Sequence, residues 1–269
     1  MSKRISLALS AALALLVLNS AARGQTTAGD VATGTAAQRA AAVPPDASHS
    51  RHGAAFDEGP RQLAHLMDGI GNVHFPITTS RPEAQAFFDQ GINLLYSFWY
   101  YEAERAFRTA AMLDPNCAMA YWGMAQCMSD DNPERAKAAL KLAREKESQV
   151  SDRERRYIDA LALLQGPGDD EKAKQKQYTQ AMERLILAYP DDVEAKVMLI
   201  MQGWFGDSSR VAIDALLRQV LAKNPRHPGA HHLRIHLWDS QEDGAAALDS
   251  CRIYPTLAPN IGHAQHMPG

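Results

Sequence analysis

Histidine is the residue type whose distribution in this chain points to chemistry. The sequence has 269 residues and 10 histidines, and six of them lie in the last 43 residues: His227, His231, His232, His236, His263 and His266. Imidazole nitrogens are the commonest protein ligands for transition metals, and they exchange protons near neutral pH. The C-terminal part of the chain is therefore where a metal-binding or catalytic site is expected.

The spacing of these residues places most of them on two shared helix faces. His232, His236 and Asp239 are separated by four and three residues, and His263 and His266 by three, so each set shares one face of a helix. Packed helices lie about 8–10 Å apart, so both sets can converge on one point. Four imidazoles and one carboxylate suit Zn²⁺ or Cu²⁺. The five residues are predicted metal ligands; the alternatives are a groove that binds a peptide and histidines that pack on one another.

A repeat marked by proline predicts the helices that would position these side chains. Pro115, Pro190, Pro225 and Pro259 each end an amphipathic stretch and are each followed five residues later by alanine. The spacings are 75, 35 and 34 residues, and a period of 34–35 is typical of stacked helical hairpins. Proline cannot continue a helix, which suits a turn between units. The pattern predicts an all-α solenoid of about five units, with the last one incomplete at Gly269.

Individual helices are predicted from apolar periodicity and from caps. Ser151 followed by Glu154 forms a capping-box pattern that opens one helix, and Gly166-Pro167-Gly168 separates it from the next. A short helical piece and an extended segment over residues 72–80 are expected before the repeats. The helices expected after the first unit cover 117–128, 133–147, a stretch after Ser151, 170–188, 193–202, 209–222, 229–239 and 242–253.

The unit from Ala84 to Asn116 resembles a tetratricopeptide repeat. The residues that carry this resemblance stand at the separations of that repeat: Gly91, Tyr100, Ala103, Phe107, Ala110, Leu113 and Pro115. Phe98 replaces the usual loop glycine, so this turn is expected to differ. The aromatic residues from Tyr96 to Tyr101 are expected to be core residues.

Several segments also resemble an uncharacterised group of exported bacterial tetratricopeptide proteins with a histidine-rich C-terminal repeat. They are NVHFPITTS, SFWYYEAERAF, CAMAYWGMA, HPGAHHLRIHLWD and APNIGHAQHMPG. In that group the equivalents of His74, Trp122, His232, His236, His263 and His266 recur. The resemblance names no activity. It implies that related chains continue beyond the position of Gly269.

The tetratricopeptide resemblance implies that fixed positions of each first helix line a concave groove. It places the histidines at 232, 236, 263 and 266 in this groove together with Asp239, and it leaves His227 and His231 outside as structural or solvated residues. The remaining groove positions are predicted to contact a protein or peptide partner: Gln85, Phe88, Ile92, Met119, Trp122, Gln126, Val197 and Met201.

The N-terminal part of the chain predicts export. Lys3 and Arg4 precede a short apolar run and small residues, which is typical of a signal peptide over 1–24, cleaved after Ala22 or Gly24; an uncleaved membrane anchor is the alternative. Residues 25–60 are rich in Ala, Gly, Ser and Pro and predict a disordered tether. An N-terminal extension (61–83) and the repeat domain (84–269) follow, and no later segment is predicted to span a membrane. The protein is expected to be periplasmic or extracellular.

Charge and cysteine content argue against two further classes of protein, nucleic-acid-binding proteins and disulfide-rich proteins. A net charge of -3 and a pI near 6.4 argue against nucleic acid as a partner. Three cysteines cannot form a disulfide framework; Cys117 and Cys127 cannot pair with each other, and pairing of either with Cys251 is left open. The leading prediction is a non-enzymatic scaffold that holds a protein or peptide partner. The alternative is a metal-binding protein or metalloenzyme that uses Zn or Cu at the histidine-rich site.

Overall fold

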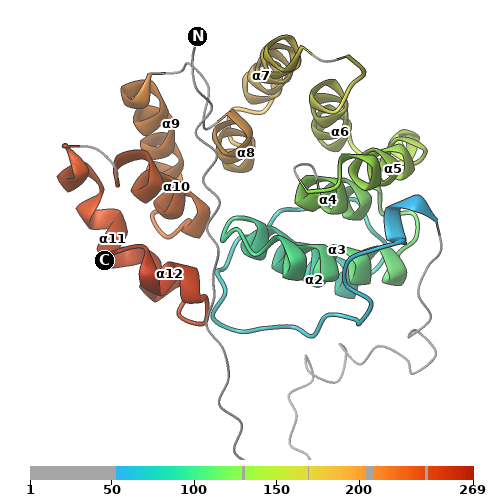
Figure 1. Cartoon of the computed structure of the whole chain (residues 1–269), viewed down its shortest axis with the longest axis horizontal. Helices are drawn as coiled ribbons and strands as arrows, with labels where there is room; N and C mark the ends of the chain where they lie inside the picture. Colours follow the sequence, from blue (N-terminus) through green and yellow to red (C-terminus); the bar gives the residue numbers. More distant parts are fainter. Residues whose placement is uncertain (1–52, 129–130, 169, 204–208, 240–241) are drawn as a thin grey trace, which may run out of the picture. The chain divides into compact units, whose positions relative to one another are not determined.

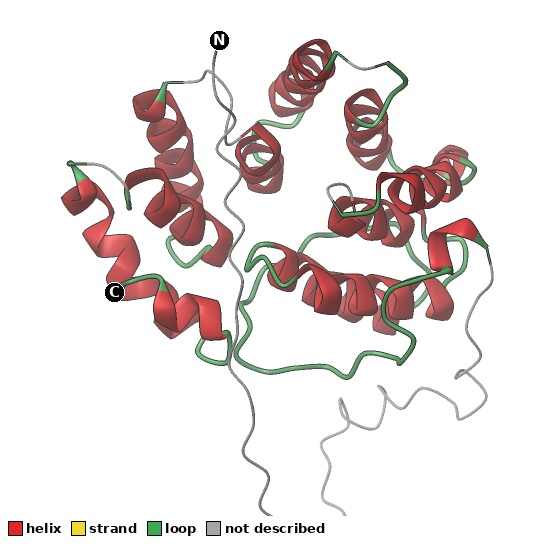
Figure 2. Ribbon diagram, viewed as in Figure 1, coloured by secondary structure: helices red, strands yellow, loops and turns green. Residues whose placement is uncertain are grey.

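The chain is described by a computed structural model over residues 53–128, 131–168, 170–203, 209–239 and 242–269. All of these residues belong to one compact unit. The predicted signal peptide and the predicted tether up to residue 52 lie outside the described residues. Figure 2 shows helices joined by loops, and no strand occurs in the described ranges. None of the helices described is long and apolar enough to cross a membrane.

Helices in this structure pair as consecutive hairpins, which confirms the predicted all-α fold (Figure 1). First helices of neighbouring hairpins also contact each other: α2 contacts α4, α4 contacts α6, and α8 contacts α10. A short helix, α12, follows the last hairpin. The hairpins are α2 (Pro82–Leu95) with α3 (Tyr100–Leu113), α4 (Ala118–Met128) with α5 (Pro133–Arg144), α6 (Asp152–Leu164) with α7 (Glu171–Ala188), α8 (Val193–Gly203) with α9 (Arg210–Lys223), and α10 (Pro228–Trp238) with α11 (Leu248–Leu257), and α12 spans Gly262–His266.

The four repeat prolines form the same turn each time. In each case the backbone N–H two residues after the proline donates to the carbonyl one residue before it: Cys117 to Asp114, Asp192 to Tyr189, His227 to Asn224, and Ile261 to Ala258. These bonds are 3.0–3.1 Å long. Each turn leads into a first helix: α4, α8, α10 or α12. The proline spacing therefore located the start of four helices correctly.

Local capping explains why several helices begin where they do. Ser151 and Glu154 form the predicted capping box at the start of α6. Asn132 caps α5 and Asp170 caps α7 through their side chains.

Two segments differ from the predicted helices. Helix α11 begins at Leu248 rather than near Glu242, after a 3-10 turn over Gly244–Ala247, and no helix forms over 61–72, where a short one was predicted.

The packed part of the chain starts before the predicted boundary near residue 61. A 3-10 turn over Ala54–Phe56 buries Ala55 and Phe56, and the Arg108 guanidinium lies 5.4 Å from the centre of the Phe56 ring. This turn packs against α5. The Ala- and Gly-rich composition concealed this turn because Phe56 is the one large apolar residue in it.

Phe107 joins the first two hairpins by lying between two glycines. A Cβ atom added at Gly91 of α2 would lie 2.5 Å from the Phe107 ring, and one added at Gly123 of α4 would also lie 2.5 Å from it. The Phe107 side chain is fully buried. Gly91 and Gly123 therefore make room for an aromatic ring of α3 between α2 and α4.

We expect Gly91→Ala to destabilise the protein by about 1–3 kcal/mol, because the added methyl group overpacks against a ring that has no room to move. Urea unfolding followed by circular dichroism measures this. Gly262→Ala is the matched control, since a Cβ there meets no atom within 4 Å. Equal stability of the two variants would contradict this account of the packing.

The three cysteines are free thiols in the structure, so the pairings that the sequence left open do not occur. Cys117 and Cys127 are buried in the hairpin core. Burial raises the pKa of Cys117 to about 12, which keeps this thiol protonated at neutral pH.

Candidate metal centre

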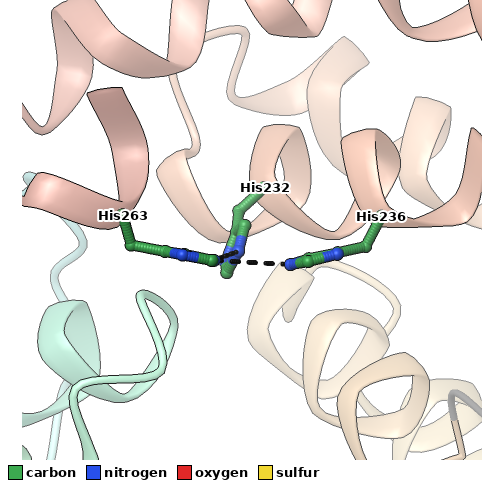
Figure 3. A group of neighbouring side chains, drawn as sticks. All are labelled: His232, His236 and His263. Atoms are coloured by element: carbon green, nitrogen blue, oxygen red, sulfur yellow. Dashed lines mark hydrogen bonds between the residues drawn. The ribbon is translucent and has the colours of Figure 1, made fainter. Parts of the chain in front are cut away.

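Two helices bring three of the predicted ligands together. His232 and His236 lie one turn apart on α10, and His263 lies near the start of α12 (Figure 3). The Nε2 atom of His263 is 2.9 Å from Nε2 of His232 and 3.4 Å from Nε2 of His236. One nitrogen from each ring lies within 4.8 Å of the other two. The proline turns before α10 and α12 set the start of each helix and so bring these residues to the same place.

Hydrogen bonds on the far side of two rings fix which nitrogen carries the proton. Nδ1 of His232 lies 2.5 Å from the carbonyl oxygen of Tyr96, which can only accept, so Nδ1 donates and Nε2 keeps its lone pair. Nδ1 of His236 lies 3.2 Å from Oδ2 of Asp239, which likewise accepts. Two lone pairs therefore point toward Nε2 of His263. Partners of this kind on the outer nitrogen are typical of histidines that bind metals.

Burial keeps the three imidazoles neutral, as metal binding requires. It lowers the pKa of His232 to about 3, an effect that the Tyr96 carbonyl opposes only in part. Burial also lowers the pKa of His236, against the effect of Asp239, and that of His263, where the neighbouring histidines act in the same direction. The cluster therefore offers unprotonated nitrogens at neutral pH.

This pKa shift predicts that the metal-free protein loses stability in mild acid. The unfolded state takes up a proton on His232 near pH 6.5 while the folded state resists until about pH 3, so stability falls as the pH drops between these values. The slope from one such histidine is at most about 1.4 kcal/mol per pH unit. Urea unfolding from pH 7 to 5 tests it. The slope should be shallower in His232→Gln, and an unchanged slope would contradict the prediction.

Phe98 covers the cluster from the loop between α2 and α3. Its φ of 59° lies in the left-handed region, and no other non-glycine residue in the described ranges has a positive φ. The ring centre lies 4.5 Å from that of His232, 5.4 Å from that of His236 and 5.9 Å from that of His263. The backbone here adopts a conformation that usually requires glycine, and it places a phenyl ring against the three histidines. Strain of this kind concentrates at functional sites.

Tyr96 is held against α10 by a contact that needs a glycine. A Cβ at Gly229 would lie 2.8 Å from the Tyr96 ring, so only glycine lets the ring pack there. The Tyr96 hydroxyl donates to Oε2 of Glu194 at 2.5 Å. These contacts fix the Tyr96 carbonyl that orients His232. The prediction that the aromatic residues from Tyr96 to Tyr101 are core residues holds for Tyr96, whereas Phe98 and Trp99 are half-buried, and it is wrong for Tyr100 and Tyr101, which are exposed. The roles of the Tyr96 carbonyl and the Phe98 ring at the cluster were not predicted.

Two of the five predicted ligands lie outside the cluster. Asp239 follows the last residue of α10, where the chain turns, so its carboxylate reaches the outer nitrogen of His236 rather than the shared centre. His266 is exposed on α12, three residues beyond His263. The structure thus supports three direct ligands, with Asp239 as a partner of one of them.

His227 and His231 are structural, as expected. Nδ1 of His227 caps α10 by accepting from the N–H of Ala230, and its Nε2 lies 3.1 Å from Glu194. His231 is held between the hydroxyl of Ser250 and the carbonyl of Pro225. Both side chains are buried and fully engaged away from the cluster.

Part of the predicted partner groove is covered by the chain itself. Residues 62–80 lie against it without helix or strand and bend at 68–70, and Val73 and Phe75 are buried while their immediate neighbours are exposed. The Phe75 ring packs on Phe88 at 5.5 Å and on Trp122 at 6.1 Å between ring centres. Six of the eight predicted groove residues are buried, while Gln85 and Met201 are half-buried: Phe88, Ile92, Met119, Trp122, Gln126 and Val197.

Side-chain amides on α2 hold the main chain of residues 62–80. Asn93 accepts from the N–H of Val73 at 3.0 Å and donates to its carbonyl at 3.1 Å. Gln90 pairs in the same way with the backbone of Met67 and His65. Gln85 accepts from the N–H of Ile77 and donates to the carbonyl of Phe75. These hydrogen bonds are made to main-chain groups, so this face of α2 can hold an extended peptide. In this structure the peptide is a segment of the same chain.

Comparisons with known proteins add little to this description. No family model and no curated protein matches the chain. One solved structure similar to it is that of YrrB, described as "a TPR protein with an unusual peptide-binding site". The identity is 17%, the alignment covers 68% of this chain and 90% of that one, and the TM-score is 0.37. The helical-hairpin fold therefore rests on the contacts within this structure.

Proposed function

We propose that this protein binds one divalent transition-metal ion, Zn²⁺ or Cu²⁺, through Nε2 of His232, His236 and His263. The observation that carries the proposal is the convergence of three imidazole nitrogens, two of which have their lone pairs fixed by partners on the opposite side of the ring. Three nitrogens around one tetrahedral ion at about 2.0–2.1 Å stand about 3.4 Å apart. The separations of 2.9 and 3.4 Å from His263 need only a small adjustment to match, and the nitrogens of His232 and His236 lie within 4.8 Å of each other.

The experiment is metal analysis of protein purified without a histidine tag, followed by titration with Zn²⁺ and Cu²⁺. We expect one ion per chain. Since the ion binds only the folded state, free metal at about 100 times its dissociation constant should raise the free energy of unfolding by about 2.7 kcal/mol. No stoichiometric metal and no shift in melting temperature with either ion would contradict the proposal.

Asp239→Asn should weaken this binding without abolishing it. The amide keeps the size of the carboxylate but removes the charge that stabilises a metal-bound His236, and such changes lower metal affinity about 10–100-fold. Isothermal titration calorimetry with Zn²⁺ measures the loss. Asp249→Asn, at an exposed position on α11, serves as the control and should leave the affinity unchanged. Equal affinity of both variants would remove Asp239 from the site.

A protein-binding scaffold is the second candidate function. The amide pairs of Asn93, Gln90 and Gln85 with the backbone of residues 62–80 favour it, because they would hold any extended peptide in the same way. A partner peptide must then compete with this segment. A labelled synthetic peptide of residues 62–80 should bind the Phe75→Ala protein more tightly than the wild type. If the peptide does not bind a Phe75→Ala protein that remains folded, this function is contradicted.

Export of the protein is also part of the proposal, and it rests on the N-terminal sequence alone.

A further inference from the structure

The three histidines leave a fourth position on a tetrahedral ion. Among the described residues, no further histidine, cysteine, aspartate or glutamate joins these three in the group whose ligand atoms lie within 4.8 Å of one another. Asp239 bonds the outer nitrogen of His236. The two nitrogens of one imidazole point in different directions, so this carboxylate cannot reach an ion on Nε2 while it keeps that bond. Three protein ligands with an open fourth position are the arrangement that catalytic metal sites have and that structural sites lack.

The charge of the centre favours an anion at that position. Three neutral imidazoles leave a divalent ion its full charge, because no carboxylate coordinates it directly. Within the described part of the chain, two charged or titratable groups near the cluster are Asp239, at the far side of His236, and His266, which acts electrostatically on His263. Asp239 is exposed, so solvent screens its charge. The ion would remain strongly electropositive.

The surroundings of the cluster restrict the size of such a ligand. His232 is fully buried, and His236 and His263 are only half-buried, so solvent reaches the centre past these two rings. Phe98 lies against all three rings, and Tyr254 stacks on His232 at 5.0 Å between ring centres. These aromatic rings limit the space beside the ion.

From this arrangement we infer that the metal ion of the proposed centre keeps one coordination position open and binds a small monodentate anion from solution there. This inference rests on the proposed metal site. The ligand is an anion of the size of azide, acetate or hydroxide, and it replaces a metal-bound water molecule without altering the three histidine ligands.

The full chain loaded with Co²⁺ tests the inference, since the visible absorption of Co²⁺ reports its coordination. Titration with sodium azide should change the spectrum saturably, with one azide per ion, and His266→Ala should respond in the same way. If Co²⁺ binds stoichiometrically and azide has no effect, the inference is wrong while the metal site stands. If only His266→Ala responds, His266 fills the fourth position and the inference is also wrong. If Co²⁺ does not bind, the proposed metal site itself fails.

Discussion

His232→Ala is expected to abolish stoichiometric metal binding. This residue supplies the most buried of the three nitrogens, its Nε2 lies 2.9 Å from that of His263, and the Tyr96 carbonyl fixes its orientation. Loss of a direct ligand should cost more than the roughly 100-fold reduction in affinity that loss of a ligand's outer hydrogen-bond partner can cause. Metal content of the purified variant, together with calorimetric titration with Zn²⁺, measures the effect.

Two histidine variants keep this test specific. His65→Ala removes an exposed imidazole from the segment of residues 62–80, and His266→Ala removes the exposed imidazole of α12; neither should change the metal content. His232→Ala also leaves the Tyr96 carbonyl without its partner, at a cost of about 1–3 kcal/mol, so circular dichroism must show that the variant is folded. A folded His232→Ala protein with unchanged metal content would place the ion elsewhere.

The repeat made most of the fold predictable from the sequence. Proline, a cap and an apolar periodicity are local signals, and they located the start of α4, α8, α10 and α12 because the same turn forms at each proline. Helix α11 was predicted less well. Its first residues form a 3-10 turn over Gly244–Ala247, and Pro255 stands inside the helix, so local propensity there is ambiguous.

The site was predictable to the extent that helix spacing determines it. His232 and His236 are four residues apart on a regular helix, so their shared face followed from the sequence alone. Asp239 lies past the end of α10, and α12 has only five residues, so the same rule was less reliable for Asp239 and His266. The partners of the site were not predictable. Tyr96 lies 136 residues from His232, and only the folded repeat brings its carbonyl there.

Residues 62–80 show a second limit of sequence reasoning. The alternation of Val73 and Phe75 with polar neighbours indicates an extended segment with one buried face. It does not say which surface buries that face, and no strand of the described chain pairs with the segment. Its backbone groups are satisfied instead by the side-chain amides of Gln85, Gln90 and Asn93, of which Gln85 was predicted to contact a partner. The packing partner of an isolated extended segment is a tertiary property.

Phe75→Ala is expected to destabilise the protein by about 3–5 kcal/mol, the usual cost of removing a fully buried phenylalanine ring. Phe75 has no exposed surface, and its ring contacts Phe88, Trp122 and Tyr157, which come from three different hairpins. The guanidinium of Arg153 also lies 4.4 Å from the ring centre. Urea unfolding measures the loss, and Phe75→Leu should lose less because it keeps most of the buried volume.

The size of this effect distinguishes a structural segment from a displaceable one. Asn72→Ala, at an exposed position in the same segment, should change the free energy of unfolding by less than about 0.5 kcal/mol. If Phe75→Ala costs the full amount, residues 62–80 complete the core between the first three hairpins, and a partner peptide must overcome that free energy to enter. If it costs less than about 1 kcal/mol, the segment rests on the groove without stabilising the fold, and the same groove is available to a partner.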